Sequence, residues 1–441
     1  MHRIAVVGTG YVGLVGGAGL ADLGHSVICV DRVEEKIEKL SRGEIPFYEP
    51  GLSEVVERNV REGRLSFTTD ISLAVAESEV VFCAVGTPEG DGGAVDLRQV
   101  DSVAEEIGRH MTGYRLIVQK STVPVGTARR IAGIIREHQS EPHEFDVVSN
   151  PEFLREGSAV GDFMRPDRVV VGADSDRAMA TMRSIYRPLY LIKTPFVETT
   201  PETAELIKYA SNAFLATKIS FINEIAGICE GVGADVQSVA YAMGLDKRIG
   251  PKFLHAGAGY GGSYFPKDTK ALVKIAEEVG REASIVAAAV EVNRLQKERM
   301  VDKVVDAAGG DVSGRTVGLL GLSFKPNTDD MRYAASQVLA AGLTERGARV
   351  RAFDPVATEN ARALMPDIEY TEDAYSAAED AHVLVIMTEW NEFRRLDLER
   401  IRDLMAEPSV VDCRNVYDPE DFEPLGFRYE GVGRGRPKET Q

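Results

Sequence analysis

Three glycines close to the N-terminus constrain the fold more than any other feature of the chain. Gly8, Gly10 and Gly13 form the pattern G-x-G-x-x-G, directly after the apolar segment 4–7 and at the start of a helical pattern. A glycine turn between a buried strand and a helix is typical of the first β-α-β unit of a doubly wound parallel sheet. The chain is therefore expected to begin with an α/β domain of the Rossmann type.

Two series of short apolar segments show the same alternation of strand and helix. They predict strands at residues 4–7, 26–30, 80–85, 116–119, 146–149 and 168–171, and again at 316–322, 349–353, 382–387 and 409–411. Between the two series, residues 200–230 predict one long helix that is apolar on most sides, which is typical of a buried connector or a dimer interface. We expect an α/β fold of two Rossmann-like domains with doubly wound parallel sheets, joined by a long central helix and a helical middle domain.

The predicted domain boundaries follow these changes of pattern. The first Rossmann domain is expected at residues 1–198, the helical middle domain at 199–300 and the second Rossmann-like domain at 301–430. The remaining residues, 431–441, contain several glycines and arginines and predict a flexible tail.

Charge and composition exclude several classes of protein. The 51 Lys and Arg residues against 69 Asp and Glu residues give a net charge of -18, which opposes general binding to nucleic acid or to an anionic membrane surface. No apolar run approaches the roughly 20 residues that cross a bilayer, and the N-terminus lacks the apolar region of a secretory signal. The four cysteines form no C-x-x-C pair, so neither a metal site nor a disulfide framework is expected. We expect a cytoplasmic enzyme with no nucleic-acid or membrane partner.

The glycine turn has the features of a dinucleotide site. Gly8 permits the tight turn, Gly10 lets the backbone approach a pyrophosphate, and Gly13 allows close packing of the helix on the strand. Asp31 ends the second predicted strand, where a carboxylate accepts a hydrogen bond from a ribose 2′-hydroxyl. A free 2′-hydroxyl indicates NAD rather than NADP as the cofactor.

Further cofactor candidates lie beside this motif or at the ends of later strands, where such ligands bind. Taken alone, the turns at these strand ends are equally well explained as ordinary turns. The complete set of cofactor-binding candidates is Gly8, Gly10, Tyr11, Val12, Gly13, Asp31, Lys36, Gly86, Thr87, Pro88, Ser121, Thr122, Glu156 and Lys267.

Polar side chains interrupt the apolar central helix. Glu205, Lys208, Asn212 and Asn223 fall on one stripe by helical spacing. Lys208 and Asn212, one turn apart, can stabilise the charge that develops on an oxygen during hydride transfer. A structural salt bridge between Lys208 and Glu205 explains the lysine equally well.

Two further segments carry candidate chemistry. Glu152 and Glu156 stand four residues apart just beyond a predicted strand, which suits general-base activation of water but also a solvated first turn of a helix. Residues 257–268 form a long glycine-rich loop with aromatic residues, which suits close approach of the backbone to a ligand.

Six sequence blocks, in order along nearly all of the chain, carry a family resemblance. They are QKSTVPVGT (119–127), NPEFLREG (150–157), ELIKYASNAFLATKISFINE (205–224), GLDKRIG (244–250), FPKDTKAL (265–272) and GLSFKPNTDDMR (321–332). These blocks resemble those of the UDP-glucose/GDP-mannose dehydrogenase family, and the form of the block at 265–269 is more similar to the UDP-glucose 6-dehydrogenase branch. The resemblance implies oxidation of a sugar primary alcohol in two steps with two NAD, through a cysteine-bound thioester to a carboxylate. For UDP-glucose the product is UDP-glucuronate, a precursor for polysaccharide biosynthesis.

The resemblance also implies roles for individual residues. Lys208 and Asn212 match the groups that stabilise charge on the C6 oxygen, Asp268 matches the group that orients or activates water, and Arg248 matches an arginine supplied by a neighbouring subunit. A homodimer or a higher homo-oligomer is therefore expected. Thr122, Glu152 and Glu156 match residues of the same pocket, with Glu152 placed for thioester hydrolysis. The UDP-sugar cradle matches Phe153, Leu154, Phe253, Gly261, Phe324, Lys325 and Arg414, and the full set of substrate-binding candidates also contains Glu152, Lys208, Asn212 and Arg248.

Tyr264 departs from the family at the centre of the chemistry. The family reads Gly-Gly-Ser-Cys-Phe-Pro-Lys-Asp, and residues 261–268 read Gly-Gly-Ser-Tyr-Phe-Pro-Lys-Asp. A phenol with a pKa of about 10 is mostly protonated at neutral pH, whereas a thiol with a pKa of about 8.5 is readily activated. The second oxidation is therefore expected to be impaired or altered. A smaller departure is Tyr333, at a position where the family usually has Glu.

Three functions remain open on these grounds. The first is a nucleotide-sugar dehydrogenase that stops at the aldehyde or reaches the acid slowly through the aldehyde hydrate. The second is a redox-neutral epimerase-like or dehydratase-like enzyme in which Tyr264 acts as acid or base beside bound NAD. The third is a catalytically silent UDP-sugar-binding subunit, although retention of Lys208, Asn212 and Asp268 disfavours it. A tyrosine introduced to trap the substrate gives the same sequence.

Overall fold

The computed structural model describes residues 1–434, and the described backbone divides into two compact units, residues 1–211 and the residues from 212 onward. One long helix, α9 (Pro201–Val232), contributes its first eleven residues to the first unit and the remainder to the second. None of the helices in the described part of the chain is long and apolar enough to span a membrane.

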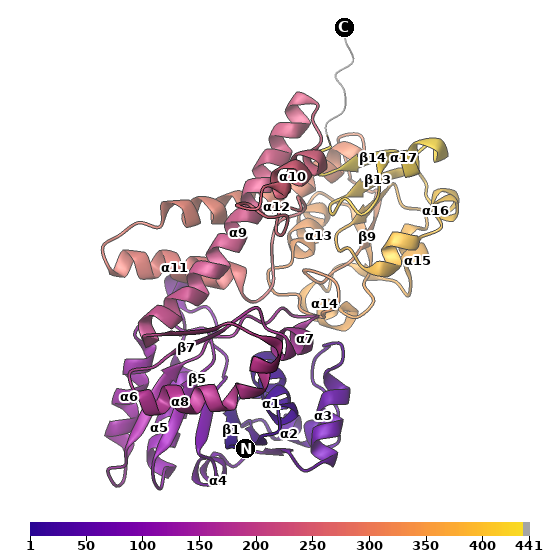
Figure 1. Ribbon diagram of the computed structural model, residues 1–441. Coiled ribbons are helices and arrows are strands. Elements are labelled where there is room, and N and C mark those ends of the chain that lie inside the picture. Colours follow the sequence, from indigo (N-terminus) through magenta and orange to yellow (C-terminus); the bar gives the residue numbers. More distant parts are fainter. Residues whose placement is uncertain (435–441) are drawn as a thin grey trace. The chain divides into compact units, whose positions relative to one another are not determined.

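The first unit is built on an eight-stranded sheet with the order β3-β2-β1-β4-β5-β6-β7-β8 (Figure 1). Its strands are β1 (Arg3–Val7), β2 (Ser26–Val30), β3 (Leu65–Thr68), β4 (Val80–Cys83), β5 (Arg115–Gln119), β6 (Phe145–Ser149), β7 (Val169–Gly172) and β8 (Phe196–Thr199). Its helices are α1 (Tyr11–Asp22), α2 (Glu34–Ser41), α3 (Leu52–Arg61), α4 (Ile71–Glu77), α5 (Arg98–His110), α6 (Thr127–His138), α7 (Ala159–Met164) and α8 (Asp176–Ile185).

Helices cover both faces of this sheet, so its central strands are apolar on both sides. Ile4 and Val6 of β1 pack into a core with α1, α3, α7 and α8, whereas Ala5 and Val7 pack into a second core with α4, α5 and α6. A strand buried on both faces reads as a continuous apolar run, and this is why the sequence identified β1, β2 and β4.

The second unit repeats the plan with a six-stranded parallel sheet of order β11-β10-β9-β12-β13-β14. Its strands are β9 (Thr316–Leu320), β10 (Arg349–Phe353), β11 (Glu369–Tyr370), β12 (Val383–Ile386), β13 (Ser409–Asp412) and β14 (Arg428–Gly431). Its helices after α9 are α10 (Val236–Leu245), α11 (Phe265–Glu278), α12 (Ser284–Ala307), α13 (Ala335–Glu345), α14 (Thr358–Leu364), α15 (Ala374–Ala378), α16 (Leu398–Leu404) and α17 (Pro419–Phe422). One core joins the sheet to α9, α12 and α13, and another joins it to α15, α16 and α17.

The predicted fold class of two Rossmann-like domains with a long central helix is confirmed, with differences at the edges. Four strands were not anticipated: β3, β8, β11 and β14. They have two to four residues each and are partly exposed, so they leave too short an apolar pattern to recognise. In the first sheet, β7 pairs with β6 in the antiparallel direction through Ser149 and Gly172, so β7 and β8 run opposite to the other six strands.

The predicted helical middle, residues 199–300, packs on the second sheet, because its core residues Ile222, Ala226 and Met300 belong to the same apolar cluster as strand β9. The tail was expected to begin at residue 431, yet the Gly433 N–H donates to Glu230 (2.7 Å), its carbonyl accepts from the Val236 N–H (2.9 Å), and Val432 is buried. The part of the predicted tail at 435–441 lies outside the described residues.

The stability of the first unit depends on pH through the protonation of His25. Its Nδ1 accepts from the His2 backbone N–H (3.2 Å) and its Nε2 donates to the Ile185 carbonyl (2.9 Å), so the ring is held in the neutral form. Burial lowers the pKa of His25 below its ordinary 6.5. The neutral His25 ring therefore stabilises the folded state fully above pH 6.5. This stabilisation is lost as the pH falls through the lower pKa that His25 has in the folded state.

We expect His25→Asn, which cannot titrate, to be less stable than the unmodified protein by about 1 kcal/mol at about pH 8, because one of two hydrogen bonds is lost. The difference should shrink at about pH 5, where the unmodified protein must protonate the buried ring. Thermal unfolding at both pH values measures this. A difference that stays constant between them contradicts the assignment.

Candidate functional site

The glycine turn after β1 is closed by contacts that exclude side chains. Gly8 has a φ of 102°, and a Cβ there would lie 2.6 Å from the Ala84 carbonyl oxygen. A Cβ on Gly13 would lie 1.9 Å from the Gly8 carbonyl oxygen, so helix α1 packs directly on the turn. At Gly10 a Cβ would meet nothing within 4 Å. The turn therefore leaves open space only at the glycine that was predicted to face a ligand.

Asp31 follows β2 and faces this turn. Its Oδ2 accepts from the backbone N–H (3.1 Å) and the hydroxyl (2.8 Å) of Thr9, and its Oδ1 accepts from the Val33 N–H (3.1 Å). Lys36 Nζ lies 3.5 Å from Oδ2. Burial by itself would raise the pKa of Asp31, but these hydrogen bonds and the lysine outweigh it and lower the pKa. The group is thus a fixed carboxylate beside the turn.

The loops after β4 and β5 are joined at the same end of the sheet. Thr87 donates from its hydroxyl to the Thr122 carbonyl (2.9 Å), and Ser121 donates to the Val85 carbonyl (2.7 Å). Because β1 and β4 are neighbours from which the chain winds in opposite directions, the crevice at their carboxyl ends is where doubly wound sheets bind ligands. Gly86, Thr87, Pro88, Ser121 and Thr122 therefore lie on the expected side of the sheet.

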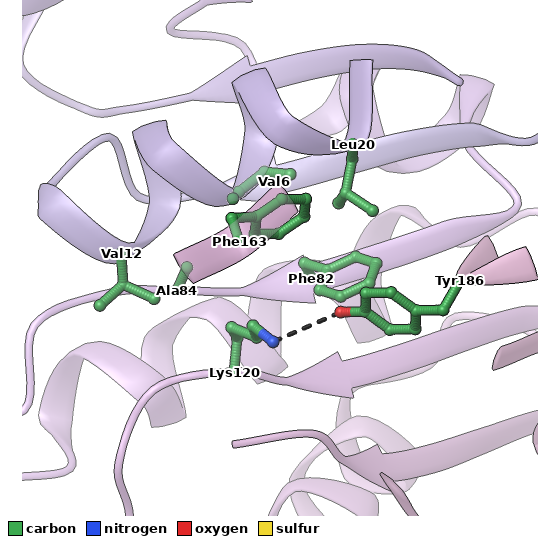
Figure 2. A pocket seen from close by; sticks show the side chains of 9 residues that line it. Val6, Val12, Leu20, Phe82, Ala84, Lys120, Phe163 and Tyr186 are labelled. Carbon is green, nitrogen blue, oxygen red and sulfur yellow. Dashed lines mark hydrogen bonds between the residues drawn. The ribbon is translucent and has the colours of Figure 1, made fainter. Parts of the chain in front are cut away.

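Tyr11 and Val12, at the start of α1, have other partners that the sequence did not reveal. The Tyr11 hydroxyl donates to Glu49, a buried carboxylate that also accepts from the Gly157 N–H (2.6 Å) and the Ala159 N–H (2.7 Å). The hydrogen bonds of Glu49 therefore connect the start of α1, beside the glycine turn, to the loop after β6. Val12 lines a small, mainly apolar cavity with Phe82 and Phe163 (Figure 2).

Glu152 and Lys208 form a buried ion pair in the first unit. Lys208 Nζ donates to Glu152 Oε1 (3.0 Å), and each residue is 3% exposed. Glu152 Oε2 accepts from the Leu154 N–H (2.5 Å), which closes the loop that follows β6. The Phe153 ring packs beneath the Arg168 guanidinium, 3.4 Å from ring centre to Cζ, and 5.4 Å from Lys208 Nζ. The predicted residues of this segment are therefore brought together.

Two alternatives raised by the sequence are wrong. Residues 151–157 are not helical and both Glu152 and Glu156 are buried, so the segment is no solvated helix turn. Lys208 pairs with Glu152, not with Glu205. The Glu205 carboxylate instead accepts from the Gly126 N–H (2.6 Å) and the Ala128 N–H (2.9 Å) at the start of α6. Glu205 thus caps α6 and fixes the first turns of α9.

In the second unit, Asn212 and Asp268 form another buried polar pair. Asn212 Nδ2 donates to Asp268 Oδ2 (2.7 Å), and Lys267 Nζ donates to Asp268 Oδ1 (2.7 Å). Asp268 is fully buried in the first turn of α11. Lys267, predicted to bind cofactor, therefore pairs within its own unit with the aspartate. Tyr264 is the residue that precedes α11, is half-buried, and accepts from the Asp268 N–H through its carbonyl (2.8 Å).

The glycine-rich loop 257–262 is held by amides that the sequence did not assign to a site. Asn293 accepts from the Tyr260 N–H (2.7 Å) and donates to its carbonyl (3.1 Å), and Gln296 donates to the Gly257 carbonyl (2.7 Å). Asn223, from the polar stripe of α9, accepts from the Gly257 N–H (2.8 Å). Three buried amides on apolar helices are the signal that could have identified these supports.

The candidates of the UDP-sugar cradle surround the same loop. A Cβ on Gly261 would lie 2.5 Å from the Tyr333 carbonyl oxygen and 3.1 Å from the Phe324 side chain. Arg414 donates to the carbonyls of Met387 (2.8 Å) and Phe324 (2.9 Å), and Lys325 Nζ lies 5.3 Å from the Phe324 ring centre. These residues follow β9 and β13 and so share the carboxyl end of the second sheet.

Lys297, a cation that the sequence analysis did not assign, lies beside these candidates. Lys297 donates to the Tyr333 carbonyl (2.7 Å), and burial, with Arg414 and Lys270 nearby, lowers its pKa to about 8. The carboxylate of Asp412, at the end of β13, accepts from the Arg414 N–H (3.0 Å) and holds the arginine's loop.

Two further predicted substrate residues make contacts of a different kind. Phe253 has a positive φ of 65°, which is uncommon for a bulky residue, and packs edge-on against Phe265 with ring centres 6.1 Å apart. Arg248 is largely exposed and pairs with Asp246, its neighbour two residues back (2.5 Å). Arg248 is not brought to the cradle of its own chain.

None of the four cysteines offers a replacement nucleophile. Cys29, Cys83, Cys229 and Cys413 are all buried. Burial raises the pKa of the thiols of Cys29, Cys83 and Cys413 to about 12, and it also raises that of Cys229. A buried thiol that resists ionisation is chemically inert.

Comparisons with known proteins agree along the whole chain. Three models of the UDP-glucose/GDP-mannose dehydrogenase family match: its NAD binding domain at residues 2–190, its central domain at 202–295 and its UDP binding domain at 318–419. The chain is 53% identical to a UDP-glucose 6-dehydrogenase of Rhizobium meliloti, over 98% of this chain and 99% of that one. It is 47% identical to the UDP-glucose 6-dehydrogenase TuaD of Bacillus subtilis, over 100% and 95%. The solved structure of a UDP-glucose dehydrogenase from Pyrobaculum islandicum superposes with a TM-score of 0.91 at 41% identity, covering 98% of each chain.

The Glu152–Lys208 pair has a measurable signature in stability. We expect Lys208→Met to destabilise the protein by about 3 kcal/mol, because the Glu152 carboxylate then stays buried without its partner. The double variant Glu152→Gln with Lys208→Met should recover most of this loss, because it removes both charges. Urea unfolding measures the free energies. Lys39→Met, which breaks an exposed pair with Glu35, is the control and should change little. Equal losses in the single and double variants contradict the pairing.

Proposed function

Because the chain belongs to the UDP-glucose/GDP-mannose dehydrogenase family and is an NAD-dependent oxidoreductase of nucleotide sugars, we propose that it oxidises the C6 hydroxyl of UDP-glucose. The observation that carries this proposal is the pair of polar groups on α9, Lys208 and Asn212. Each is buried and hydrogen-bonded to a carboxylate within its own unit, and each can donate to an oxygen. The 53% identity to a UDP-glucose 6-dehydrogenase supports UDP-glucose among the possible sugars.

The residues of the glycine turn fit NAD. The open space at Gly10 accommodates a pyrophosphate against the backbone, and Asp31 is a carboxylate that accepts from a 2′-hydroxyl and repels a 2′-phosphate. NAD, when bound, accepts the hydride from C6. The protein's own contribution is to hold the sugar carbon and to stabilise the charge on its oxygen.

We expect Gly10→Ala to weaken NAD binding by at least about tenfold, because the methyl group occupies the space needed for close approach of the pyrophosphate. The folded state should be unaffected, since the methyl group meets no protein atom. Calorimetric titration with NAD and thermal unfolding measure the two effects. Gly133→Ala in α6, which also meets nothing within 4 Å, is the matched control; it should keep the NAD affinity and be more stable by up to about 1 kcal/mol, because alanine favours the helix. An unchanged NAD affinity in Gly10→Ala contradicts the proposal that the pyrophosphate approaches the backbone at Gly10.

The roles of the other residues follow from their chemistry. Lys208 and Asn212 donate to the C6 oxygen while its proton leaves, through water, toward Asp268. Glu152 takes part in the hydration or hydrolysis that leads to the acid. The cations Arg414 and Lys325 suit the diphosphate of UDP, since a chain of net charge -18 needs local cations to hold an anion.

Tyr264 is expected to affect the two oxidations differently. The first needs only a positioned alcohol, donors to its oxygen and a route for the proton. The second needs a tetrahedral adduct on the aldehyde carbon, which a thiol forms more readily than a protonated phenol. Since the four cysteines are buried, we propose that water forms this adduct slowly and that the aldehyde or its hydrate is the main product.

We expect one NADH or fewer per UDP-glucose on the time scale of turnover, with the product identified by mass. Tyr264→Cys should gain the second NADH and form UDP-glucuronate, because a thiol lowers the barrier to the adduct by several kcal/mol, on the order of a hundredfold or more in rate. Tyr190→Cys, which places a thiol on an exposed tyrosine elsewhere, is the control and should behave like the unmodified chain.

Other product ratios decide between the remaining functions. Two NADH per sugar at equal rates in the unmodified chain and in Tyr264→Cys show that position 264 is not the lost nucleophile. Conversion of UDP-glucose without net NADH supports the redox-neutral alternative. UDP-glucose binding without conversion supports the silent subunit.

We also propose that two chains associate through α9. Phe214, Phe221 and Ile228 recur every seven residues on this helix and are 67%, 47% and 54% exposed. Aligned apolar side chains at this spacing form one stripe, which a second copy of the helix can cover. Association also gives the exposed Arg248 the role of supplying a cation to the neighbouring subunit.

We expect light scattering to show a dimer or a larger oligomer at micromolar concentration. Phe221→Glu should shift the protein toward the monomer, because a carboxylate in the middle of the stripe opposes burial. Leu191→Glu, a substitution of an 88% exposed leucine in the first unit, is the control and should leave the mass unchanged. A monomeric unmodified protein contradicts the proposal.

A further inference from the structure

Lys120 is a buried cation that the proposed chemistry does not yet use. It follows β5, is 9% exposed, and its Nζ donates to Asn150 Oδ1 (3.1 Å) and to the Tyr186 hydroxyl oxygen (3.3 Å). Figure 2 shows the Lys120 and Tyr186 side chains pointing toward each other at the edge of the small apolar cavity. The other walls of the cavity are hydrocarbon, so among the described residues the Lys120 ammonium has Asn150 and Tyr186 as its hydrogen-bond acceptors.

Asn150 connects Lys120 to the loop that carries Glu152. Its Oδ1 accepts from both Lys120 and the Tyr186 hydroxyl (2.6 Å), and its Nδ2 donates to the Val170 carbonyl (2.7 Å). Asn150 is thereby fixed between β6 and β7, two residues before Glu152. The position of the Glu152 carboxylate thus depends on the hydrogen bonds around Lys120.

Lys120 belongs to a cluster of charged groups in the first unit. Glu152 and Lys208 both interact electrostatically with Lys120, and Lys208 also pairs with Glu152. Arg168, half-buried, interacts with Glu152 and with the exposed Asp167. The Glu205 carboxylate, which lines a pocket with Lys208, accepts from the start of α6 and from Ser149. The Lys120 ammonium therefore adds positive charge beside the Glu152–Lys208 pair.

We propose that Lys120 is a positioning residue for the dehydrogenase reaction, which fixes the loop of Glu152 through Asn150 and supplies the positive charge that favours an anionic oxygen at C6. This inference rests on the proposed function. An oxygen that becomes negative beside Lys208 is also attracted by the Lys120 ammonium, and the low polarity of the walls strengthens this attraction.

Binding measurements test this inference without turnover. The probes are UDP-glucuronate, which carries a carboxylate at C6, and UDP-glucose, which carries a hydroxyl there. Calorimetric titration of the full chain should show a preference for the carboxylate that falls by about tenfold in Lys120→Met. Lys39→Met is the matched control and should keep the preference. An unchanged preference in a folded Lys120→Met overturns the inference.

The unmodified protein provides a second test that needs no substitution at Lys120. Burial lowers the pKa of Lys120 to about 8, whereas the carboxylate of UDP-glucuronate does not titrate near that value. The preference for UDP-glucuronate should therefore decline as the pH rises through about 8. Tyr186→Phe removes an acceptor of the ammonium, so the decline should move to lower pH. A preference that does not change with pH, or a midpoint that Tyr186→Phe does not move, overturns the inference. If neither nucleotide sugar binds at any pH, the proposed function itself fails.

Discussion

Burial of charge at the ends of apolar strands is the constraint on which the sites of this protein depend. The central strands are covered on both faces, so polar groups gather where the strands end and must find partners there. Glu152 and Lys208 meet this requirement as an ion pair, and Asn212 meets it with Asp268. Each pair leaves a donor and an acceptor fixed beside a strand or helix end. Such fixed donors cost little reorganisation when charge develops on a substrate oxygen.

The two sheets use a similar aspartate in different ways. Asp31 and Asp354 each follow the second strand of their sheet. Asp354 is buried and accepts from the backbone N–H groups of Leu322, Ser323 and Val356, so it holds its own loop together. Asp31 makes fewer such bonds and its side chain is 11% exposed. The same fold thus carries a carboxylate that we propose to face the cofactor in one unit and a structural carboxylate in the other.

The loops that carry the proposed site residues are held by residues remote in sequence. Lys120, Asn150 and Tyr186 belong to different elements, yet together they fix the loop of Glu152. In the second unit, Asn293 and Gln296 on α12 hold the glycine-rich loop in the same way. Buried amides, hydroxyls and amines with satisfied hydrogen bonds are rigid, which keeps the neighbouring charges at fixed distances.

The sequence predicted the elements whose pattern is local. The glycine turn at residues 8–13 and the strands buried on both faces were recognised because backbone sterics and continuous apolar runs act over a few residues. Short edge strands such as β8 and β14 were not predicted, because they form by pairing with a neighbouring strand more than through their own composition. Likewise, the order at residues 431–434 depends on Glu230 and Val236, which lie about two hundred residues earlier.

The partners of the charged groups were decided only by the tertiary structure. Spacing on the central helix allowed Lys208 to pair with Glu205, but folding directs Glu205 to the start of α6 and brings Glu152 to Lys208. The sequence determined that a lysine, two carboxylates and a tyrosine at position 264 are present. It could not determine which charged groups pair with each other. Pairing of buried charges depends on the distance between them in space, and that distance is fixed only when the sheet has formed.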